Sequence, residues 1–194
     1  MLGMAAVIAA GAMHGGNQAA APAGLSGAVF QMFNHGTISA MLFILVGVVY
    51  DRAHHRDIDG FGGLAKQMPL YSGICMIAFF AGLGLPGFSG FISEFMCFIG
   101  AFPVFKAIVI ISTIGILLNA AYFLSAYKRI FFGELNEKYK DMSEINNREL
   151  FTVVPLAAVT LLLGVYPRPF LDLISNTIDH LIYQVTQIGG FAGF

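Results

Sequence analysis

The chain has 194 residues, of which 57% are hydrophobic and 11% are charged, with a formal net charge of −1 at pH 7. A soluble domain of this length needs more charged residues to cover its surface, so the composition excludes an ordinary soluble protein and indicates an integral membrane one. The nearly neutral charge also excludes the basic field of a nucleic-acid-binding protein, and we expect no nucleic-acid partner.

The N-terminal part of the chain predicts an incomplete helix followed by a loop. Residues 1–13 are apolar but shorter than the roughly 17 to 25 residues that cross a bilayer, so we expect a partial transmembrane helix whose beginning is missing. Residues 14–24 are rich in Gly, Ala and Pro without periodicity, which indicates an exposed loop. Residues 25–187 are then expected to form one membrane bundle.

Four full transmembrane spans are predicted in this bundle, at about residues 25–50, 70–100, 103–132 and 150–166. The first contains no Asp, Glu, Lys or Arg, and the second is interrupted at Pro86 and Gly87. Pro103 suits the first turn of the third helix. Because proline cannot continue a helix, the Pro167-Arg168-Pro169 run is expected to end the fourth.

Residues 170–187 predict a different kind of helix. Apolar side chains recur there at three- and four-residue spacing, and polar side chains take the opposite face. Such an amphipathic helix lies along a surface, either of the membrane or of a partner subunit. The expected fold is therefore all-α and membrane-integral, with about four full transmembrane helices, a partial N-terminal one, one helix broken at Pro86 and a C-terminal amphipathic helix.

The basic residues gather in two polar segments of the chain. Three of the ten Lys and Arg residues lie between Asp51 and Pro69, and five lie between Lys128 and Leu150. Because basic loops face the cytoplasm or its organellar equivalent, both segments are expected on that side of the membrane. The turn near Ala101 and the amphipathic helix are expected on the other side.

Glu94 is the exception among the 11 acidic residues, because the others lie in polar loops or beyond the fourth span. A carboxylate at this depth costs several kcal/mol unless it is paired, hydrated or protonated, so an intramembrane glutamate is a functional candidate by default. Its neighbours one helical turn away include no cation, so any partner comes from another helix or from water. The alternative is a glutamate that caps or braces the broken helix.

His35 lies near the middle of the first span. Imidazole titrates near neutral pH and can pass a proton through either ring nitrogen, which suits a water-linked proton relay. The alternative is a core histidine that is hydrogen-bonded to a backbone carbonyl or a hydroxyl group. His54 and His55 lie in the charged loop and are expected to be solvated.

The break at Pro86 and Gly87 falls close to the middle of the second span. Proline removes a backbone donor and glycine lets the chain change direction. Broken transmembrane helices occur where the freed backbone groups meet protein or water, and they often mark ion pathways. Because Glu94 follows Pro86 by about two helical turns, the combination favours ion or proton translocation.

The two cysteines, Cys75 and Cys97, lie inside apolar segments and are expected to be small buried hydrophobic residues. The sequence contains no CxxC, no HExxH and no His/Cys cluster, so we expect no protein-bound metal or iron–sulfur site. It also contains neither GxGxxG nor a Walker loop.

Several motifs then appear in an order that is specific to one family. The runs FNHGTISAMLFILVGVVYDRAHHRDIDGFGGLAKQMP and LGLPGFSGFISEF hold an HG pair, a Tyr50-x-Arg52-x-x-x-Arg56 loop, a Gly-Gly pair and an LPG-x-x-G-F-x-x-E motif. In these motifs, and over nearly its whole length, the chain resembles the antiporter-like proton-pumping subunits of respiratory complex I, the NADH-quinone oxidoreductase.

This resemblance implies a fold of fourteen helices in two inverted five-helix repeats. The chain would carry the end of helix ten, helices eleven to fourteen and the C-terminal lateral element. The family places a proton-conducting histidine where His35 stands and a terminal protonatable residue where Glu94 stands. Sibling subunits usually have lysine at the second position, so Glu94 points to the chain M (subunit 4) branch.

The resemblance also implies what this chain lacks and where it works. The first repeat, its Glu–Lys pair and the central lysine have no counterpart here, so we expect a fragment or truncated gene product that cannot pump protons by itself. NAD, FMN, iron–sulfur clusters and quinone would reside in partner subunits, with no cofactor and no redox site in this chain. The expected partners are lipid and the other membrane-arm subunits, especially neighbouring antiporter-like chains. The expected location is the bacterial inner membrane, in preference to an organellar inner or thylakoid membrane.

Two alternatives to a complex I subunit remain open. The same fold serves multisubunit sodium–proton antiporters and membrane-bound hydrogenases, which sodium-dependent transport or neighbouring genes would reveal. The chain could instead be a non-pumping structural remnant that only packs against its neighbours.

Overall fold

The computed structural model describes residues 20–191, and this part of the chain is entirely helical apart from its loops and turns. The helices follow one another along the chain as α2 (Ala21–Ala53), η1 (Ile58–Gly60), α3 (Leu64–Gln67), α4 (Pro69–Leu83), α5 (Ser89–Ala101), α6 (Lys106–Phe131), η2 (Glu137–Tyr139), α7 (Asn147–Val165) and α8 (Arg168–Phe191). Helices α2, α6 and α7 are long and apolar enough to cross a membrane, and α4 and α5 are the two halves of a broken span. The all-α membrane fold with one helix broken at Pro86 is confirmed.

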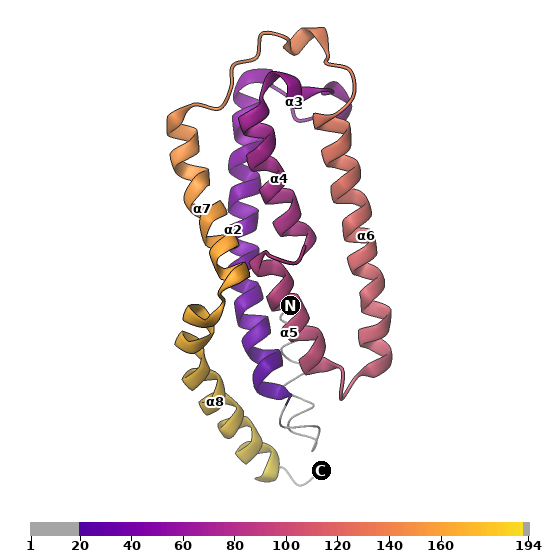
Figure 1. The fold of residues 1–194 in the computed structure, drawn as a ribbon. Coiled ribbons are helices and arrows are strands. Elements are labelled where there is room, and N and C mark those ends of the chain that lie inside the picture. The colour runs from indigo at the N-terminus through magenta and orange to yellow at the C-terminus, as the bar shows by residue number, and fades with distance from the viewer. Residues whose placement is uncertain (1–19, 192–194) are drawn as a thin grey trace.

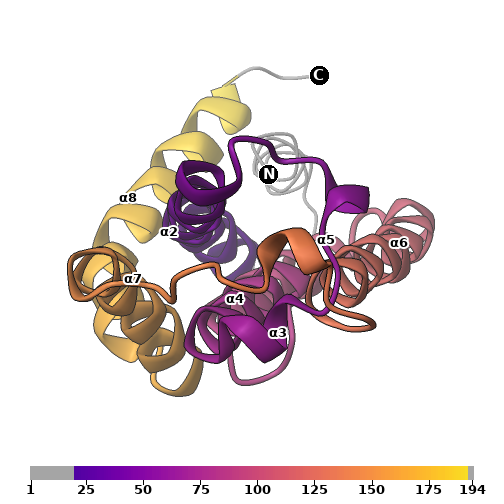
Figure 2. The same ribbon diagram turned by 90° about the horizontal axis from the view of Figure 1, so that it is seen from above.

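The helices form an elongated bundle in which α4 and α5 stack end to end beside α2 (Figure 1). Helix α6 stands on one flank of this central group and α7 on the other. Seen along the bundle in Figure 2, α6 and α8 lie at opposite edges. Helix α2 has 33 residues, a length of about 50 Å, which exceeds the roughly 30 Å of a bilayer core.

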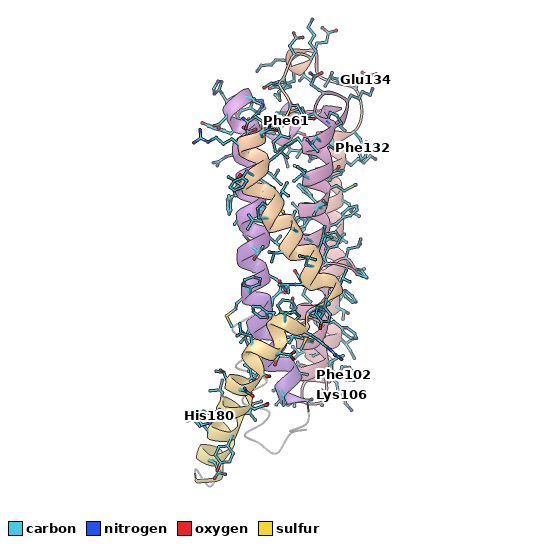
Figure 3. The ribbon with its side chains drawn as sticks, turned by 60° about the vertical axis from the view of Figure 1, so that its left-hand side comes forward. Phe61, Phe102, Lys106, Phe132, Glu134 and His180 are labelled. Atoms are coloured by element: carbon cyan, nitrogen blue, oxygen red, sulfur yellow. The ribbon has the colours of Figure 1, made fainter. Side chains whose placement is uncertain are left out.

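The two basic segments meet at one end of the bundle. The backbone N–H of Gly63 donates to the Phe132 carbonyl at 3.1 Å, which joins the loop after α2 to the loop after α6. Figure 3 shows Phe132 and Glu134 at this end and Phe102 and Lys106 at the opposite end. The prediction that both basic segments share one side is confirmed, and the assignment of that side to the cytoplasm stays a prediction.

Helices α2 and α5 are packed most closely, because small residues line their contact. A Cβ atom on Gly100 would overlap the backbone of Gly24, and one on Gly27 would lie 2.6 Å from the Cβ of Met96. In a membrane, where lipid tails are as apolar as leucine, helices associate through such close van der Waals contact. Helix α5 is therefore held against α2 by direct backbone approach.

Helices α4 and α6 are joined through larger side chains. The Tyr127 hydroxyl donates to the Ser72 carbonyl at 3.1 Å, and the rings of Phe79 and Phe123 meet edge to face with centroids 5.5 Å apart. Cys75 lies in the same core, is 2% exposed and is a free thiol, as expected from the sequence. Edge-to-face aromatic pairs and buried hydroxyl bonds fix the register of the two helices.

Several predicted boundaries differ from the structure. Residues 21–24, expected to belong to a loop, already form the first turn of α2, because Pro22 suits that turn, where its missing N–H costs nothing. The rest of that expected loop, residues 14–19, lies outside the described residues. Pro103 does not begin the third helix but lies in the preceding turn, and α6 begins at Lys106. The partial helix expected over residues 1–13 lies outside the described residues.

The C-terminal helix α8 turns its apolar face toward its own chain. The ring of Phe170 stacks on Phe30 with centroids 4.9 Å apart and also contacts Phe33 of the same helix α2 at 4.8 Å. Further along α8, Ile178 is 4% exposed and packs in a cluster with Leu25 and Val109. The predicted amphipathic helix therefore forms, and its first turns lie along the bundle itself.

Candidate functional site

The broken span creates a gap in helical hydrogen bonding within the bundle. Helix α4 ends at Leu83 with Gly84 at φ +75°, and α5 begins at Ser89. A Cβ atom on Gly164 of α7 would overlap the Gly87 carbonyl, so α7 packs its backbone directly onto the break. The break is thus enclosed by protein on this side, as a broken helix in a membrane requires.

The Glu94 side chain reaches back toward this break. A Cβ atom on Gly84 would lie 2.8 Å from Oε2 of Glu94, so the carboxylate contacts the residue that directly follows α4. Side chains on a helix point toward its N-terminus, which explains why a residue in the second turn of α5 reaches the break. Among the described residues Glu94 makes no ion pair.

Glu94 and His35 line the same cavity, which has a volume of about 590 Å³ and lies between α2, α5, α6 and the end of α4. Its polar lining comes from Gln31, His35 and Ser39 of α2, Glu94 of α5, and Ser112, Asn119 and Tyr122 of α6. His35 is not a buried core histidine in this structure, because its side chain is exposed. The structure therefore brings the two predicted residues together, and their roles as proton carriers remain predictions.

A buried polar network that the sequence reasoning missed joins α2 to the first turns of α5. The Asn34 amide donates to the Ser89 carbonyl and to the Ser93 hydroxyl, both at 2.9 Å, and Ser93 donates to the Gln31 side-chain oxygen. Ser93 is fully buried and precedes Glu94. The sequence does contain a pattern that could have predicted this network. Asn34 and His35 follow Gln31 by three and four residues, which places these polar side chains on one face of the helix.

A second missed residue, Asn119, connects α6 to the break. Its side-chain amide donates to the Gly82 carbonyl at 3.0 Å, in the last turn of α4. The four last carbonyls of a helix have no partner within the helix, so this bond satisfies one group that the break frees. Helix α6 thereby contributes to the site, although most of its surface faces away from the bundle.

The basic end of the bundle is held by a charge cluster and is not a solvated surface throughout. The Arg52 guanidinium forms a two-pronged ion pair with Glu149, at 2.9 and 2.8 Å, and also donates to the Glu144 carbonyl at 3.1 Å. The Glu149 carboxylate accepts from the Asn146 backbone and completes a capping box at the start of α7. Arg52, expected only as part of a basic loop, therefore ties α2 to α7.

His55 also differs from the expectation of a solvated loop residue. Its ring stacks on Phe61 with centroids 4.6 Å apart, and its Nε2 contacts the Tyr139 hydroxyl. The Asp57 backbone N–H donates to Nδ1, so Nδ1 is the acceptor and Nε2 carries the proton. Tyr139 comes from η2, far along the chain, and it contacts a ring that was expected to be solvated. His54, by contrast, is exposed as predicted.

Among residues 20–191, no group of three or more His, Cys, Asp or Glu side chains could hold a metal ion. What the site offers is one carboxylic acid, one imidazole and several neutral hydrogen-bonding groups around a space large enough for water. Such an arrangement can hold and pass protons without any bond to carbon being made or broken.

Comparison with known proteins gives consistent matches. A family model described as NADH:quinone oxidoreductase/Mrp antiporter, TM, matches residues 2–119. NADH-quinone oxidoreductase subunit M of Rhodobacter capsulatus is 48% identical to this chain over 160 residues, which are 82% of this chain and 31% of that protein. The chain spans about a third of the length of the curated relatives it matches.

Two solved structures share the fold. A chain of respiratory complex I from Thermus thermophilus with bound NADH gives a TM-score of 0.79 at 24% identity, covering 95% of this chain and 37% of its own length. A chain of the Mrp complex from a Dietzia species gives a TM-score of 0.73 at 20% identity, covering 85% of this chain and 40% of its own length. At these identities the likeness shows the fold alone.

The architecture points in the same direction as these matches, with a broken membrane helix, an intramembrane glutamate and a polar cavity. The family model covers more than half of the chain. The chain is a multi-pass membrane protein and belongs to the NADH:quinone oxidoreductase/Mrp antiporter transmembrane family.

Proposed function

We propose that this chain forms part of a proton-translocating membrane-arm subunit of NADH-quinone oxidoreductase. The observation that carries the proposal is the shared cavity, in which the Glu94 carboxylate meets the helix break and the His35 imidazole lines the same space. An unpaired carboxylate and an imidazole in one intramembrane cavity are the groups that a proton path requires.

In this proposal Glu94 takes up and releases protons on the exit side, and His35 relays protons to it through water. A change of charge in a neighbouring subunit would alter the electrostatic cost of ionising Glu94 and so drive proton release. The break at Pro86 and Gly87 frees backbone N–H and C=O groups that water can reach. In this proposal these groups and the Glu94 carboxylate lie at the same depth in the membrane.

We also propose that this chain holds no redox site of its own, and that NAD, FMN, iron–sulfur clusters and quinone are bound in partner subunits. The sequence supports this division, because it contains no nucleotide-binding glycine motif and no cysteine pair of cluster-binding spacing. The proposed partners are other membrane-arm subunits, above all neighbouring antiporter-like chains, together with lipid. The proposed location is the bacterial inner membrane.

The test is Glu94→Gln in the full-length protein within the assembled complex, because glutamine keeps the size and removes the proton site. The number of protons moved per NADH oxidised, measured in sealed membrane vesicles, should fall. The matched control is Asp172→Asn, which neutralises an exposed carboxylate on α8 outside the cavity and should leave the ratio unchanged. Normal pumping by an assembled Glu94→Gln complex would refute the role of Glu94.

The second candidate is a cation–proton antiporter subunit, which the Mrp part of the family favours. Replacing sodium by potassium in the same vesicles separates the two functions. Proton movement that follows NADH oxidation in both salts supports the complex I assignment, whereas proton movement that requires a sodium gradient supports the antiporter.

A further inference from the structure

The Asn34 side chain bonds α2 to the beginning of α5 with its amide N–H groups. It donates to the Ser89 carbonyl and to the Ser93 hydroxyl, each at 2.9 Å, and it is 1% exposed. A backbone carbonyl only accepts hydrogen bonds, so the contact with Ser89 fixes which way the amide faces. Ser89 is the first residue of α5 and Ser93 lies one turn later, so both bonds reach one face of the half-helix that follows the break.

The cavity residues stand next to these bonded residues on both helices. His35 directly follows Asn34 on α2, and Glu94 directly follows Ser93 on α5. Successive residues of a helix point about 100° apart, so the bonded face and the cavity face are neighbours on each helix. On α5 the cavity face is continued by Gly90, Cys97 and Phe98. The bonds of Asn34 therefore hold α5 at the rotation that turns Glu94 toward the cavity.

These hydrogen bonds constrain α5 in a way that its other contacts with α2 do not. The glycine contacts further along α5 hold the two helices close together, whereas a hydrogen bond also has a direction and weakens steeply when it is bent. A rotation of α5 by about 20° would carry a side-chain end, at a helix radius of about 5–6 Å, through about 2 Å. Such a movement would separate Asn34 from its two acceptors and the Glu94 carboxylate from the break.

We propose that Asn34 and Ser93 are positioning residues that hold the Glu94 carboxyl group toward the cavity and the helix break. Neither residue carries a proton along the path. Asn34 donates from α2, Ser93 accepts on α5, and Glu94 then contacts Gly84 while it lines the cavity that it shares with His35. This inference rests on the proposed function of Glu94 and assigns the buried network a role in it.

The test is Ser93→Ala in the full-length protein within the assembled complex, because alanine removes the hydroxyl and little else. The number of protons moved per NADH oxidised, measured in sealed vesicles, should fall toward the value measured for Glu94→Gln. The infrared C=O stretching band of the protonated Glu94 carboxyl group is identified by its loss in Glu94→Gln. In Ser93→Ala this band should shift or broaden, because the carboxyl group is no longer held in one position.

The matched control is Ser72→Ala, which removes the same kind of hydroxyl outside the cavity lining. Ser72 lies on α4 and is 6% exposed, and its hydroxyl bonds to the Tyr127 hydroxyl of α6 at 3.0 Å. The control therefore also breaks a buried bond between two helices. Thermal unfolding should be lowered to a similar degree in both variants, whereas only Ser93→Ala should change the proton ratio and the infrared band.

A second variant tests whether Asn34 and Ser93 act through the same contact. Asn34→Leu has a similar volume and removes both bonds from the α2 side, so it should lower the proton ratio and also serves as the test if Ser93→Ala does not assemble. In the double variant the ratio should be no lower than in Asn34→Leu alone, because both changes break one contact. A loss equal to the sum of the two single losses would contradict a shared role.

The outcomes separate this inference from the proposed function. If Glu94→Gln lowers pumping while the assembled Ser93→Ala complex keeps a normal ratio and an unchanged band, the network is purely structural and the function of Glu94 stands. If Ser72→Ala shows the same losses as Ser93→Ala, the effect comes from reduced stability and the inference fails. Normal pumping by an assembled Glu94→Gln complex removes the proposed function itself.

Discussion

Replacing Gly84 by alanine tests whether the position of the Glu94 carboxylate at the helix break matters for function. The new Cβ atom would lie 2.8 Å from Oε2, whereas ordinary contact begins at 3.4 Å, so the carboxylate must retreat by about 0.6 Å. Oε2 ends a flexible side chain and can move. The cost to stability then comes mainly from placing alanine at φ +75°, about 1–2 kcal/mol.

The matched control for this variant is Gly87→Ala in the same break. Gly87 has φ +103°, so alanine is strained there too, but no described atom lies within 4 Å of the added Cβ. The two variants therefore share the strained backbone and differ in whether they displace the Glu94 carboxylate.

The assay is the number of protons moved per NADH oxidised in sealed vesicles, with assembly of the complex measured in parallel. We expect both variants to assemble somewhat less well, and Gly84→Ala to pump fewer protons per NADH than Gly87→Ala. Misplacing a reacting group by a fraction of an ångström is enough to slow a transfer step severalfold. If the two variants moved equal numbers of protons per NADH, the contact between Gly84 and Glu94 would have no effect on proton pumping.

Two further predictions concern stability, measured by thermal unfolding of the purified full-length protein in detergent. Arg52→Lys keeps the charge but loses the two-pronged ion pair with Glu149, and it should lower the free energy of unfolding by about 1–2 kcal/mol. Its control is Arg148→Lys at an exposed position nearby, which should change the free energy of unfolding by less than about 0.5 kcal/mol. Gly164→Ala places a Cβ atom against the backbone of the break and should lower the free energy of unfolding by about 1–3 kcal/mol. Its control is Gly115→Ala on α6, where the added Cβ atom meets open space, and this variant should be neutral or slightly stabilising. If Arg52→Lys and Arg148→Lys lowered stability equally, the ion pair between Arg52 and Glu149 would not stabilise the protein. If Gly164→Ala and Gly115→Ala had equal effects, the close packing of α7 on the break would be contradicted.

Much of the fold follows from the sequence, because a bilayer demands long apolar segments and tolerates few charges. That requirement alone locates the spans, the break at Pro86 and the exceptional Glu94. The ends of helices are predicted less well, as Pro103 shows. Proline is common both in loop turns and in the first turn of a helix, so its presence does not decide where the helix begins.

The surroundings of the site were harder to predict, because they depend on how the helices meet. Asn34 and Ser93 are ordinary polar residues in the sequence and become a network only when α2 and α5 come into backbone contact. His55 looks like a solvated loop residue until Tyr139, which follows it by more than eighty positions, covers its ring. Contacts between distant segments carry no local sequence signal.

Helix α2 is continuous where α4 and α5 are interrupted, and it packs against both of them. Small residues bring it against α5, and the Tyr71 hydroxyl of α4 donates to the Leu45 carbonyl of α2 at 2.8 Å. The break is the only direct chain connection between α4 and α5, and it holds Gly84 and Gly87 at positive φ outside regular helix. A change of angle between α4 and α5 would therefore be absorbed at these two glycines and not by bending of a helix. Glu94 lies on α5 and Gly84 directly after α4, so the distance between them is the one that such a change of angle alters first.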